Sequence, residues 1–474
     1  MGEQESEKKM NVDGPRINQG GMSDEQAPAP RGGKPRVMGP KRDQVEWRVF
    51  DMDALIPEDH RARTLWEAVE QMDLSSFYDA IRSREEGPGR DAYDPMVLLA
   101  LWLYATSEGV GSARQVSRLC ERDHPYMWIC GGLKPNYHAL SDFRSRHGDK
   151  LDKVLTELLG SLMAAGLLKI RRVAQDGTRT RANAGASSFR RESTLLGRSL
   201  KEAEEQVAAL KRELEEDPSA SDARERAARE RAARERHEAV KRAVDELPKV
   251  QAAHERTQKK RAREQARRRA SKLRRKARKT GEPSHTTEPE EQPKEPRVST
   301  TDPEARIMKM GDSGFRPGYN LQFATDTASR FIVGFDVTNE GTDRAQLLPM
   351  LDQIEQRTGR RPDEALVDGG YTALEAIHAA EIAGTRMYAP VSKPRTSNVD
   401  PYAPKRGDTP ATAAWRARMK DEDAKTIYKE RAAVSETIHA DLRAWRGLGR
   451  LPVRGRAKVR AVGLLLLPIT RKRG

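Results

Sequence analysis

The amino-acid sequence predicts a mixed α/β domain that is interrupted by a charged helical insertion and preceded by an all-α domain. Three observations predict this architecture. Apolar residues follow helical spacing over residues 46–165, whereas after residue 304 they form alternating or continuous strand-like runs. Between the first predicted strand and the later ones, residues 190–280 are almost entirely charged residues and alanine. The chain has 474 residues, so two or three domains are expected.

Charge and apolar content narrow the classes of function. The formal net charge is +15, so a polyanion is the expected partner, because each cation that neutralises a phosphate releases a counterion. Nucleic acid is the first candidate and a membrane surface the second. The sequence contains neither an apolar run of about eighteen residues nor a signal-peptide pattern, so we expect a cytoplasmic protein. Cys120 and Cys130 are spaced for neither a zinc site nor a disulfide framework.

The N-terminal third of the chain divides into a tail and a helical domain. Residues 1–45 are rich in glycine, proline and charge, which predicts a disordered tail. Residues 65–81 and 94–110 have helical apolar spacing, and Asp94 followed by Pro95 is typical of a helix N-terminus. The helical domain is therefore expected over residues 46–165.

Residues 112–147 predict short helices joined by a glycine-containing turn. The last of these helices is expected to carry Arg144 and Arg146 on a polar face. This pattern is typical of a helix-turn-helix-like DNA-binding domain, and it would make both arginines DNA contacts. A small helical bundle with an ordinary solvated face explains the same pattern. The sequence leaves both interpretations, the DNA-binding domain and the plain bundle, open.

The insertion, residues 190–280, begins with the seam of a coiled coil. Its apolar residues alternate spacings of four and three, which is the a/d pattern, and Pro218 ends it; they are Leu196, Leu200, Ala203, Val207, Leu210 and Leu214. The strongly cationic segment 259–279 follows, so we expect a helical hairpin with one arm along nucleic-acid phosphates. A solvated, partly disordered charged helix is the alternative. Proline and polar residues make 281–303 a predicted linker.

The α/β domain is expected from residues 168–189 and 304–460. Its predicted elements are a strand over 170–176, a hairpin over 319–339, a helix over 346–359, a strand over 364–371, a helix over 374–384, a strand over 386–392 and a helix over 427–445. Because the first strand precedes the charged segment and the others follow it, the charged segment is an insertion within this domain.

Two predicted strands end in an aspartate, Asp176 and Asp368. An α/β sheet presents functional side chains at the carboxyl ends of its strands, so these two carboxylates are expected to lie close together. Two nearby carboxylates repel and stay ionised only with a cation between them. Mg²⁺ suits this role because it binds a few carboxylates together with waters and substrate phosphates. Glu436, on the last predicted helix, is the candidate for a third ligand.

The helix that carries Glu436 also carries candidate phosphate-binding residues. Helical geometry places Tyr428, Arg431 and Ser435 on one face with Glu436 beside it, and Arg443 two turns farther on the side of Glu436. The planar fork of arginine suits phosphate oxygens better than lysine does.

Other charged residues of the predicted domain compete with these candidates. Lys309 and Arg306, just before the hairpin, are further candidates for DNA contacts. We assign Asp343 to helix capping and Asp326 and Asp336 to local structure of the hairpin.

The ordered motifs resemble the DDE transposases of bacterial insertion sequences. They are DGT around Asp176, YNLQFATD near residue 320, LVDGGY around Asp368 and the Tyr-x-x-Arg segment followed by Glu436. The segments DPMVLLALWLYA and GGLKPNYHALSDFR resemble the N-terminal domain of the same family, and a coiled-coil insertion between the first and second acids is typical of one branch. The resemblance covers about residues 45–460.

The resemblance implies a ribonuclease H-like catalytic domain whose three acids are Asp176, Asp368 and Glu436. Such a domain uses two Mg²⁺ ions roughly 3.5–4 Å apart, for which Mn²⁺ can substitute, to activate water or a 3′-hydroxyl and to stabilise the leaving oxygen. The implied partners are double-stranded DNA at the element ends and at the target. A homodimer associated with the nucleoid is also implied.

The C-terminus departs from the family pattern. In place of a closing apolar helix with a histidine-asparagine-leucine signature, the chain reads VGLLLLPITRKRG, and Pro468 is expected to end that helix early. Residues 461–474 are therefore predicted to be an atypical basic tail. Two alternatives to an active transposase stay open: a transposase-derived DNA-binding protein without activity, and a metal-dependent nuclease that cuts without joining strands.

Overall fold

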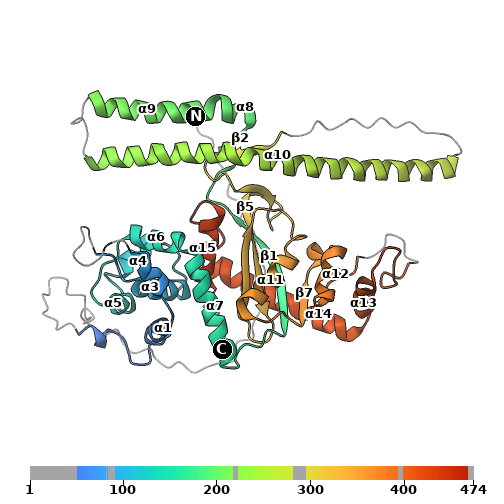
Figure 1. Ribbon diagram of the computed structural model, residues 1–474, viewed down its shortest axis with the longest axis horizontal. Helices are drawn as coiled ribbons and strands as arrows, with labels where there is room; N and C mark the ends of the chain where they lie inside the picture. Colours follow the sequence, from blue (N-terminus) through green and yellow to red (C-terminus); the bar gives the residue numbers. More distant parts are fainter. Residues whose placement is uncertain are drawn as a thin grey trace, which may run out of the picture. The chain divides into compact units, whose positions relative to one another are not determined.

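The computed structural model describes residues 51–81, 83, 91–216, 223–280, 295–392 and 399–467 (Figure 1). The predicted disordered tail, residues 1–45, lies outside the described residues, as do Pro218 and Pro468. No helix in these ranges has the length and apolar character needed to cross a membrane.

An all-helical region comes first. Its helices are α1 (Arg61–Glu70), α2 (Ser75–Asp79), α3 (Pro95–Ser107), α4 (Ala113–Leu119), α5 (His124–Cys130), α6 (Tyr137–Arg146) and α7 (Gly148–Ala164). Helix α3 is buried along nearly its whole length. Its start confirms the prediction, since Asp94 accepts a hydrogen bond of 2.8 Å from the Met96 N–H and Pro95 occupies the first turn.

The predicted helix over residues 65–81 is two helices, α1 and α2. The chain leaves α1 after Glu70, and Asp73 then accepts a hydrogen bond of 3.0 Å from the Ser75 N–H. This side chain also forms an ion pair of 2.8 Å with Lys153 of α7. An aspartate that bonds a backbone N–H competes with continuing the helix, which explains the break.

A six-stranded mixed sheet forms the second region. Its strands are β1 (Arg172–Arg181), β4 (Arg306–Lys309), β5 (Phe315–Asp326), β6 (Ile332–Thr338), β7 (Glu364–Val367) and β8 (Arg386–Tyr388). The order is β4-β5-β1-β7-β8, with β6 also paired to β5. β5 is antiparallel to β1, β4 and β6, whereas β1, β7 and β8 are parallel. This arrangement is the expected ribonuclease H-like mixed sheet.

Helices cover the sheet and bury its strands. They are α11 (Leu347–Thr358), α12 (Leu374–Ile382), α13 (Pro410–Arg418), α14 (Glu422–Ala440) and α15 (Arg456–Leu466). Helix α14 packs on β1 and β7, and α11 and α15 pack on β6. Residues 317–326 of β5 are all buried as a consequence.

The charged insertion forms a helical hairpin on a small two-stranded sheet. Helix α9 (Leu200–Glu216) lies beside α10 (Ala223–Thr280), and β2 (Phe189–Arg191) pairs with β3 (Arg297–Ser299) (Figure 1). A short helix, α8 (Glu192–Thr194), and a π-helical turn connect β2 to α9. A small apolar cluster joins hairpin and sheet; its buried members are Leu195, Ala203, Val240, Ala243, Leu247 and Val298. The predicted seam residue Ala203 therefore faces α10, whereas Leu196 is exposed.

Two predicted boundaries differ from the structure. The linker prediction over 281–303 is wrong at its end, because Arg297–Ser299 form β3 and Val298 and Ser299 are buried. The tail prediction over 461–474 is wrong at its start, because α15 continues to Leu466 with Ala461 to Leu466 buried against other elements. Helical apolar spacing outweighs the basic residues that follow.

Candidate active site

Asp176 and Asp368 lie on adjacent parallel strands. Gln175 of β1 is the pairing partner of Val367 of β7, and each aspartate is the next residue on its chain. β7 ends at Val367, earlier than the predicted range 364–371, and Asp368 directly follows its last residue. The prediction that Asp176 ends its strand is wrong, because β1 continues to Arg181 through its pairing with β5. What ends at Gln175 is the pairing of β1 with β7, so the two carboxylates meet at the edge where β7 stops.

Each of these aspartates is held by a nearby backbone N–H. Asp368 accepts a hydrogen bond of 2.7 Å from Gly370 and thereby caps the short 3₁₀ turn Gly369–Tyr371. Asp176 accepts one of 2.8 Å from Gly177. A carboxylate that accepts a backbone N–H has a fixed orientation, so both side chains are held in place before any ligand arrives.

A cation from helix α14 faces the first aspartate. Arg431 Nη1 donates a hydrogen bond of 2.9 Å to Asp176 Oδ2, and the guanidinium lies 5.8 Å from the ring centre of Tyr428. Helix α14 is fixed along β1 by a second ion pair of 2.8 Å, between Glu430 and Arg172. The predicted pair Tyr428 and Arg431 therefore does face the acids.

The pKa of Asp176 is raised above its ordinary value. Burial is the largest cause, because it disfavours the charged form; the charge of Arg431 opposes it, and the charges of Asp368 and Asp343 add to it. The same three carboxylates raise the pKa of Tyr371, whose main cause is its own burial. Asp343 therefore shares the electrostatic environment of the two predicted acids.

Asp343 is a site residue that the sequence interpretation assigned to helix capping, and that assignment is wrong. No side chain caps α11, and its N-cap residue is Gln346. Asp343 Oδ1 instead accepts hydrogen bonds of 2.7 Å from each of two amides, Asn320 and Gln322 of β5. Tyr371 donates its hydroxyl hydrogen to Gln322. A buried polar network thus fixes this third carboxylate beside the other two.

Glycine at two positions makes room for this network. A Cβ atom on Gly177 would lie 2.5 Å from Asp343 Oδ1 and 2.9 Å from Asn320 Oδ1. A Cβ atom on Gly370 would lie 2.8 Å from Asp368 Oδ1 and 3.3 Å from Asp343 Oδ2. Any larger residue would push the carboxylates apart, which explains a glycine directly after Asp176 and two residues after Asp368.

Glu436 is on α14 but apart from this network. Its side chain is exposed, and among the described residues it does not form with Asp176 and Asp368 a group of three carboxylates close enough to hold one metal ion. Its position is five residues, or roughly 140° around the helix, from Arg431. The neighbouring Ser435 is buried instead. The role of Glu436 as the third acid stays a prediction.

Two of the predicted DNA contacts lie along the edge of the site. Arg443 is exposed in the π-helical turn Asp441–Trp445 and donates a hydrogen bond of 2.9 Å to the Arg179 carbonyl of β1. Lys309 is exposed at the end of β4, where its carbonyl accepts a hydrogen bond of 3.2 Å from Arg179. Arg179 itself, which the sequence interpretation missed, lies 3.9 Å from Asp343 Oδ2.

Two other predicted DNA contacts have structural roles. Arg144 is 6% exposed, donates to the Gly111 carbonyl and lies 4.4 Å from the Trp102 ring centre, so its assignment to a polar face is wrong. Burial lowers its pKa to about 10. Arg306 forms an ion pair of 2.8 Å with Glu246 of α10. Arg146 is exposed and lies 3.2 Å from Asp142, so it stays a candidate.

The donor set fits a divalent cation at Asp176 and Asp368. No three His, Cys, Asp or Glu side chains of the described residues are close enough together to hold one ion. Mg²⁺ does not need three, because it binds through one or two carboxylates plus waters and substrate phosphates. Asp368 Oδ2 accepts no hydrogen bond from the described part of the chain, so one oxygen is available beside Asp176. Asp343 Oδ2 faces the same space.

A sequence signal for the missed network exists in β5. Asn320 and Gln322 are two residues apart, so they face the same side of a strand in which the adjoining residues Leu321, Phe323 and Ala324 are apolar. Polar side chains on a buried strand need partners, and this pair therefore indicated a buried acceptor.

Two family models match the chain. A transposase domain (DUF772) matches residues 50–146, and a transposase DDE domain matches residues 289–467. The second range includes Asp343, Asp368 and Glu436 but not Asp176. No curated protein and no solved structure matches the chain. Both matched ranges agree with the ribonuclease H-like sheet and the helical region before it, and the chain belongs to the DDE transposases of insertion sequences.

Proposed function

We propose that this chain binds the ends of an insertion sequence and catalyses metal-dependent cleavage and strand transfer of DNA. The observation that carries the proposal is the position of Asp176 and Asp368 side by side on adjacent parallel strands, with Arg431 facing them from α14. Two fixed carboxylates at a strand edge and a cation that balances part of their charge suit the binding of a divalent ion and a phosphate together.

Asp176 and Asp368 would hold the metal. With a divalent cation held by these two carboxylates, the site would supply a lower pKa to the attacking water or 3′-hydroxyl and stabilisation of the leaving oxygen. Mg²⁺ is the proposed ion, with Mn²⁺ as a substitute. Arg431 orients Asp176 and limits the repulsion between the acids, and the exposed Arg443 and Lys309 at the same edge hold phosphates of the DNA. Tyr428 packs beside Arg431 and supports it.

The identity of the third acid separates two versions of this site. Family resemblance implies Glu436, whereas Asp343 is the third carboxylate beside the other two in the structure. We propose that Glu436 supplies the third ligand when DNA is bound, and that Asp343 positions the strand edge through Asn320 and Gln322. On this basis Glu436→Gln abolishes cleavage, whereas Asp343→Asn lowers it and leaves the metal dependence in place.

The test uses a DNA fragment that carries the sequences flanking the gene, with Mg²⁺, Mn²⁺ or no divalent ion. We expect cleavage and joining by the wild type and loss of both in Asp368→Asn, with unchanged DNA binding. Asp363→Asn is the matched control, because this aspartate, whose side chain is 44% exposed, lies just before the other end of β7. Cleavage without joined products would identify a nuclease. Binding without cleavage by the wild type would leave only a DNA-binding protein and contradict the proposal.

The functional unit is proposed to be a homodimer in the nucleoid, since transposition must act on two ends of one element. The helical region over residues 46–165 is proposed to bind DNA, with Arg146 as its candidate contact. Sedimentation of the protein with and without end DNA tests the dimer, because only a dimer that forms on DNA doubles the protein content of the complex.

A further inference from the structure

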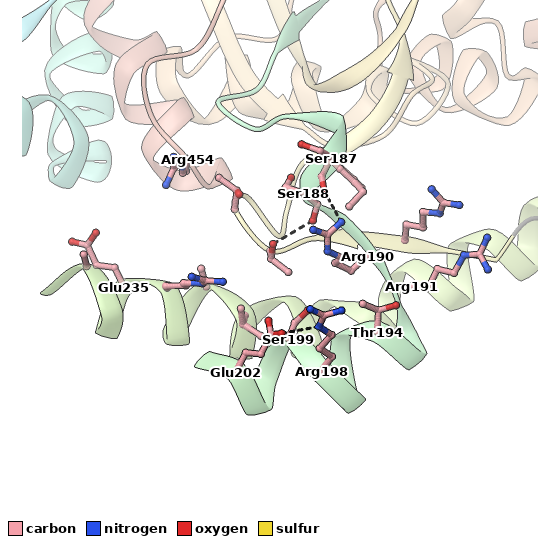
Figure 2. Close-up of a pocket in the computed structure, with 18 residues that line it drawn as sticks. Ser187, Ser188, Arg190, Arg191, Thr194, Arg198, Ser199, Glu202, Glu235 and Arg454 are labelled. Carbon is pink, nitrogen blue, oxygen red and sulfur yellow. Dashed lines mark hydrogen bonds and ion pairs between the residues drawn. The ribbon is translucent and has the colours of Figure 1, made fainter. Parts of the chain in front are cut away.

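A cationic hollow lies where the helical hairpin meets the β2–β3 region and the loop before α15. Its volume is about 950 Å³, and its walls come from the β2 and β3 region, from the start of the hairpin, from α10 and from the loop before α15. Figure 2 shows Ser187, Ser188 and Arg454 on one side of the hollow and Arg198 and Glu202 on the hairpin at the other side, with Arg190 between them. No residue of the acid site lines it.

Arginine dominates the lining of this hollow. Its arginines are Arg190, Arg191, Arg198, Arg236, Arg297 and Arg454. Its only carboxylates are Glu202 and Glu235, which leaves an excess of four positive charges. All six arginine side chains are exposed. Such a concentration of one sign attracts an anion and disfavours a cation or an apolar ligand.

Only some of the lining arginines form ion pairs with carboxylates. Arg198 is paired with Glu202 at 2.7 Å, and Arg191 lies 3.4 Å from Glu295. The remaining four arginines form no ion pair of 4 Å or less within the described part of the chain: Arg190 donates to the Ser187 carbonyl and Arg236 to the Gln206 amide oxygen. Glu202 feels the charges of Arg190 and Arg236, and Asp302 that of Arg454, but six arginines against two lining carboxylates still leave a net positive charge for an incoming anion.

The framework under these arginines is packed and hydrogen-bonded. The hydroxyl groups of Ser188 and Ser299 lie 2.7 Å apart, and the Thr300 N–H donates to the Ser188 carbonyl at 3.0 Å. The hollow is therefore formed by a paired strand and a packed helix, so its arginines start from defined positions.

We propose that this hollow binds the phosphodiester backbone of a DNA strand, at a second contact separate from the carboxylates. The guanidinium fork matches phosphate oxygens, and serine and threonine hydroxyls around it supply further donors. Its one aromatic lining residue, Phe189, is buried, so no ring is available to stack on a base. Phosphate contacts position DNA without reading its sequence. The inference rests on the proposed function, which makes DNA the partner.

The test compares two triple variants by the salt dependence of binding to a mixed-sequence duplex of about 40 base pairs. R190Q/R236Q/R297Q removes three of the four lining arginines that form no ion pair and leaves Arg454 in place. K405Q/R406Q/K420Q removes the same charge from exposed positions on either side of α13, outside the hollow and outside the cationic segment 259–279. Each lost phosphate contact lowers the slope of log K against log salt by about 0.9. The slope of log K against log salt is therefore expected to be up to about 2.7 smaller for the first variant than for the wild type, and less than about one smaller for the control.

The slope loss has a direct counterpart in affinity. When salt rises from about 50 to 200 mM, the wild type should lose roughly 40 times more of its DNA affinity than a variant that lacks three phosphate contacts. The lysine variant R190K/R236K/R297K keeps the charge and should keep most of the slope, which separates electrostatic contact from misfolding. Equal slope losses in R190Q/R236Q/R297Q and in the control K405Q/R406Q/K420Q would overturn the proposal.

A free anion is the other source of the same chemistry. Titration calorimetry with inorganic pyrophosphate tests it on the wild type and on R190Q/R236Q/R297Q. Pyrophosphate binding that the variant loses, with an unchanged DNA slope, would overturn the DNA assignment. The Asp368→Asn experiment is independent of this test. If Asp368→Asn loses cleavage while R190Q/R236Q/R297Q keeps the salt slope of the wild type, the proposed function stands and the hollow is not a DNA contact. If the triple variant loses slope but the wild type does not cleave DNA, the hollow is a DNA contact and the proposed function fails.

Discussion

Arg431 of α14 donates a hydrogen bond of 2.9 Å to Asp176 of β1, and both side chains are about four-fifths buried. The contact joins residues 255 positions apart in the sequence. It explains how α14 is held over the strand edge where the acids meet. It also supplies the one cation that lowers the pKa of Asp176 against the effects of burial and of two other carboxylates.

The energy of this contact can be measured by a double-mutant cycle. Arg431→Met should lower the free energy of unfolding by about 1–3 kcal/mol, because Asp176 is left partly buried without its partner. In an Asp176→Asn background the same change should cost less, with a coupling of at least about 0.5 kcal/mol. Urea denaturation of the four proteins measures it. Equal costs in both backgrounds would show that the two side chains do not interact.

Gly177→Ala should damage the site more than the fold. The new methyl group would overlap Asp343 and Asn320, at a cost of about 1–3 kcal/mol. We expect cleavage to fall at least tenfold while DNA binding stays within about twofold. The control is Gly160→Ala on α7, where a Cβ atom meets nothing within 4 Å. That substitution should stabilise the protein by about 0.5–1 kcal/mol. Unchanged cleavage by Gly177→Ala would contradict the tight fit.

Asp152 ties the helical region to two helices that cover the six-stranded sheet. This residue of α7 accepts a hydrogen bond from Arg357 of α11 and lies 3.0 Å from Arg460 of α15. Asp152→Ala should cost about 3–5 kcal/mol, because Arg357, whose side chain is 4% exposed, loses its carboxylate partner. Asp142→Ala removes the exposed partner of Arg146 and should cost under about 1 kcal/mol. Thermal unfolding compares the two variants, and similar costs would rule out a special role for Asp152.

His439 should make the fold sensitive to mild acid. Burial lowers its pKa to about 4, with Arg443 and Arg431 adding to the effect. The unfolded chain binds a proton near pH 6.5, so it gains protons before the folded state does and stability falls between about pH 6.5 and 4.

The expected loss over this range is on the order of 2–3 kcal/mol, and His439→Gln should remove it. Urea denaturation across this pH range is the measurement. His138→Gln, at an exposed position of α6, is the control and should respond to acid as the wild type does. An unchanged acid response in His439→Gln would assign the sensitivity to other groups.

The local pattern of the sequence was sufficient for most elements of the sheet. Apolar alternation and glycine stops predicted β5, β6, α11, β7, α12 and α14, because each element buries one face and shows this in its spacing. Asp368 was found for the same reason, since it directly follows a short buried strand. Asp176 was found by its motif, although β1 runs past it.

Contacts between distant segments decided what local pattern could not. Arg144 looks like a surface cation in sequence, yet Trp102 and the Gly111 carbonyl enclose it, because α6 packs that face against α3. Asp343 looks like a helix cap, yet amides from β5 draw it to the acids.

The sequence by itself determined the order of the elements, the adjacency of two acids and the family. Periodicity and motifs carry that information, because they are properties of neighbouring residues. The tertiary structure alone decided which charges are balanced. Whether Arg431, Asp343 or the arginines of the hollow meet a partner depends on segments that approach each other only after folding, where burial and distance set the strength of each charge.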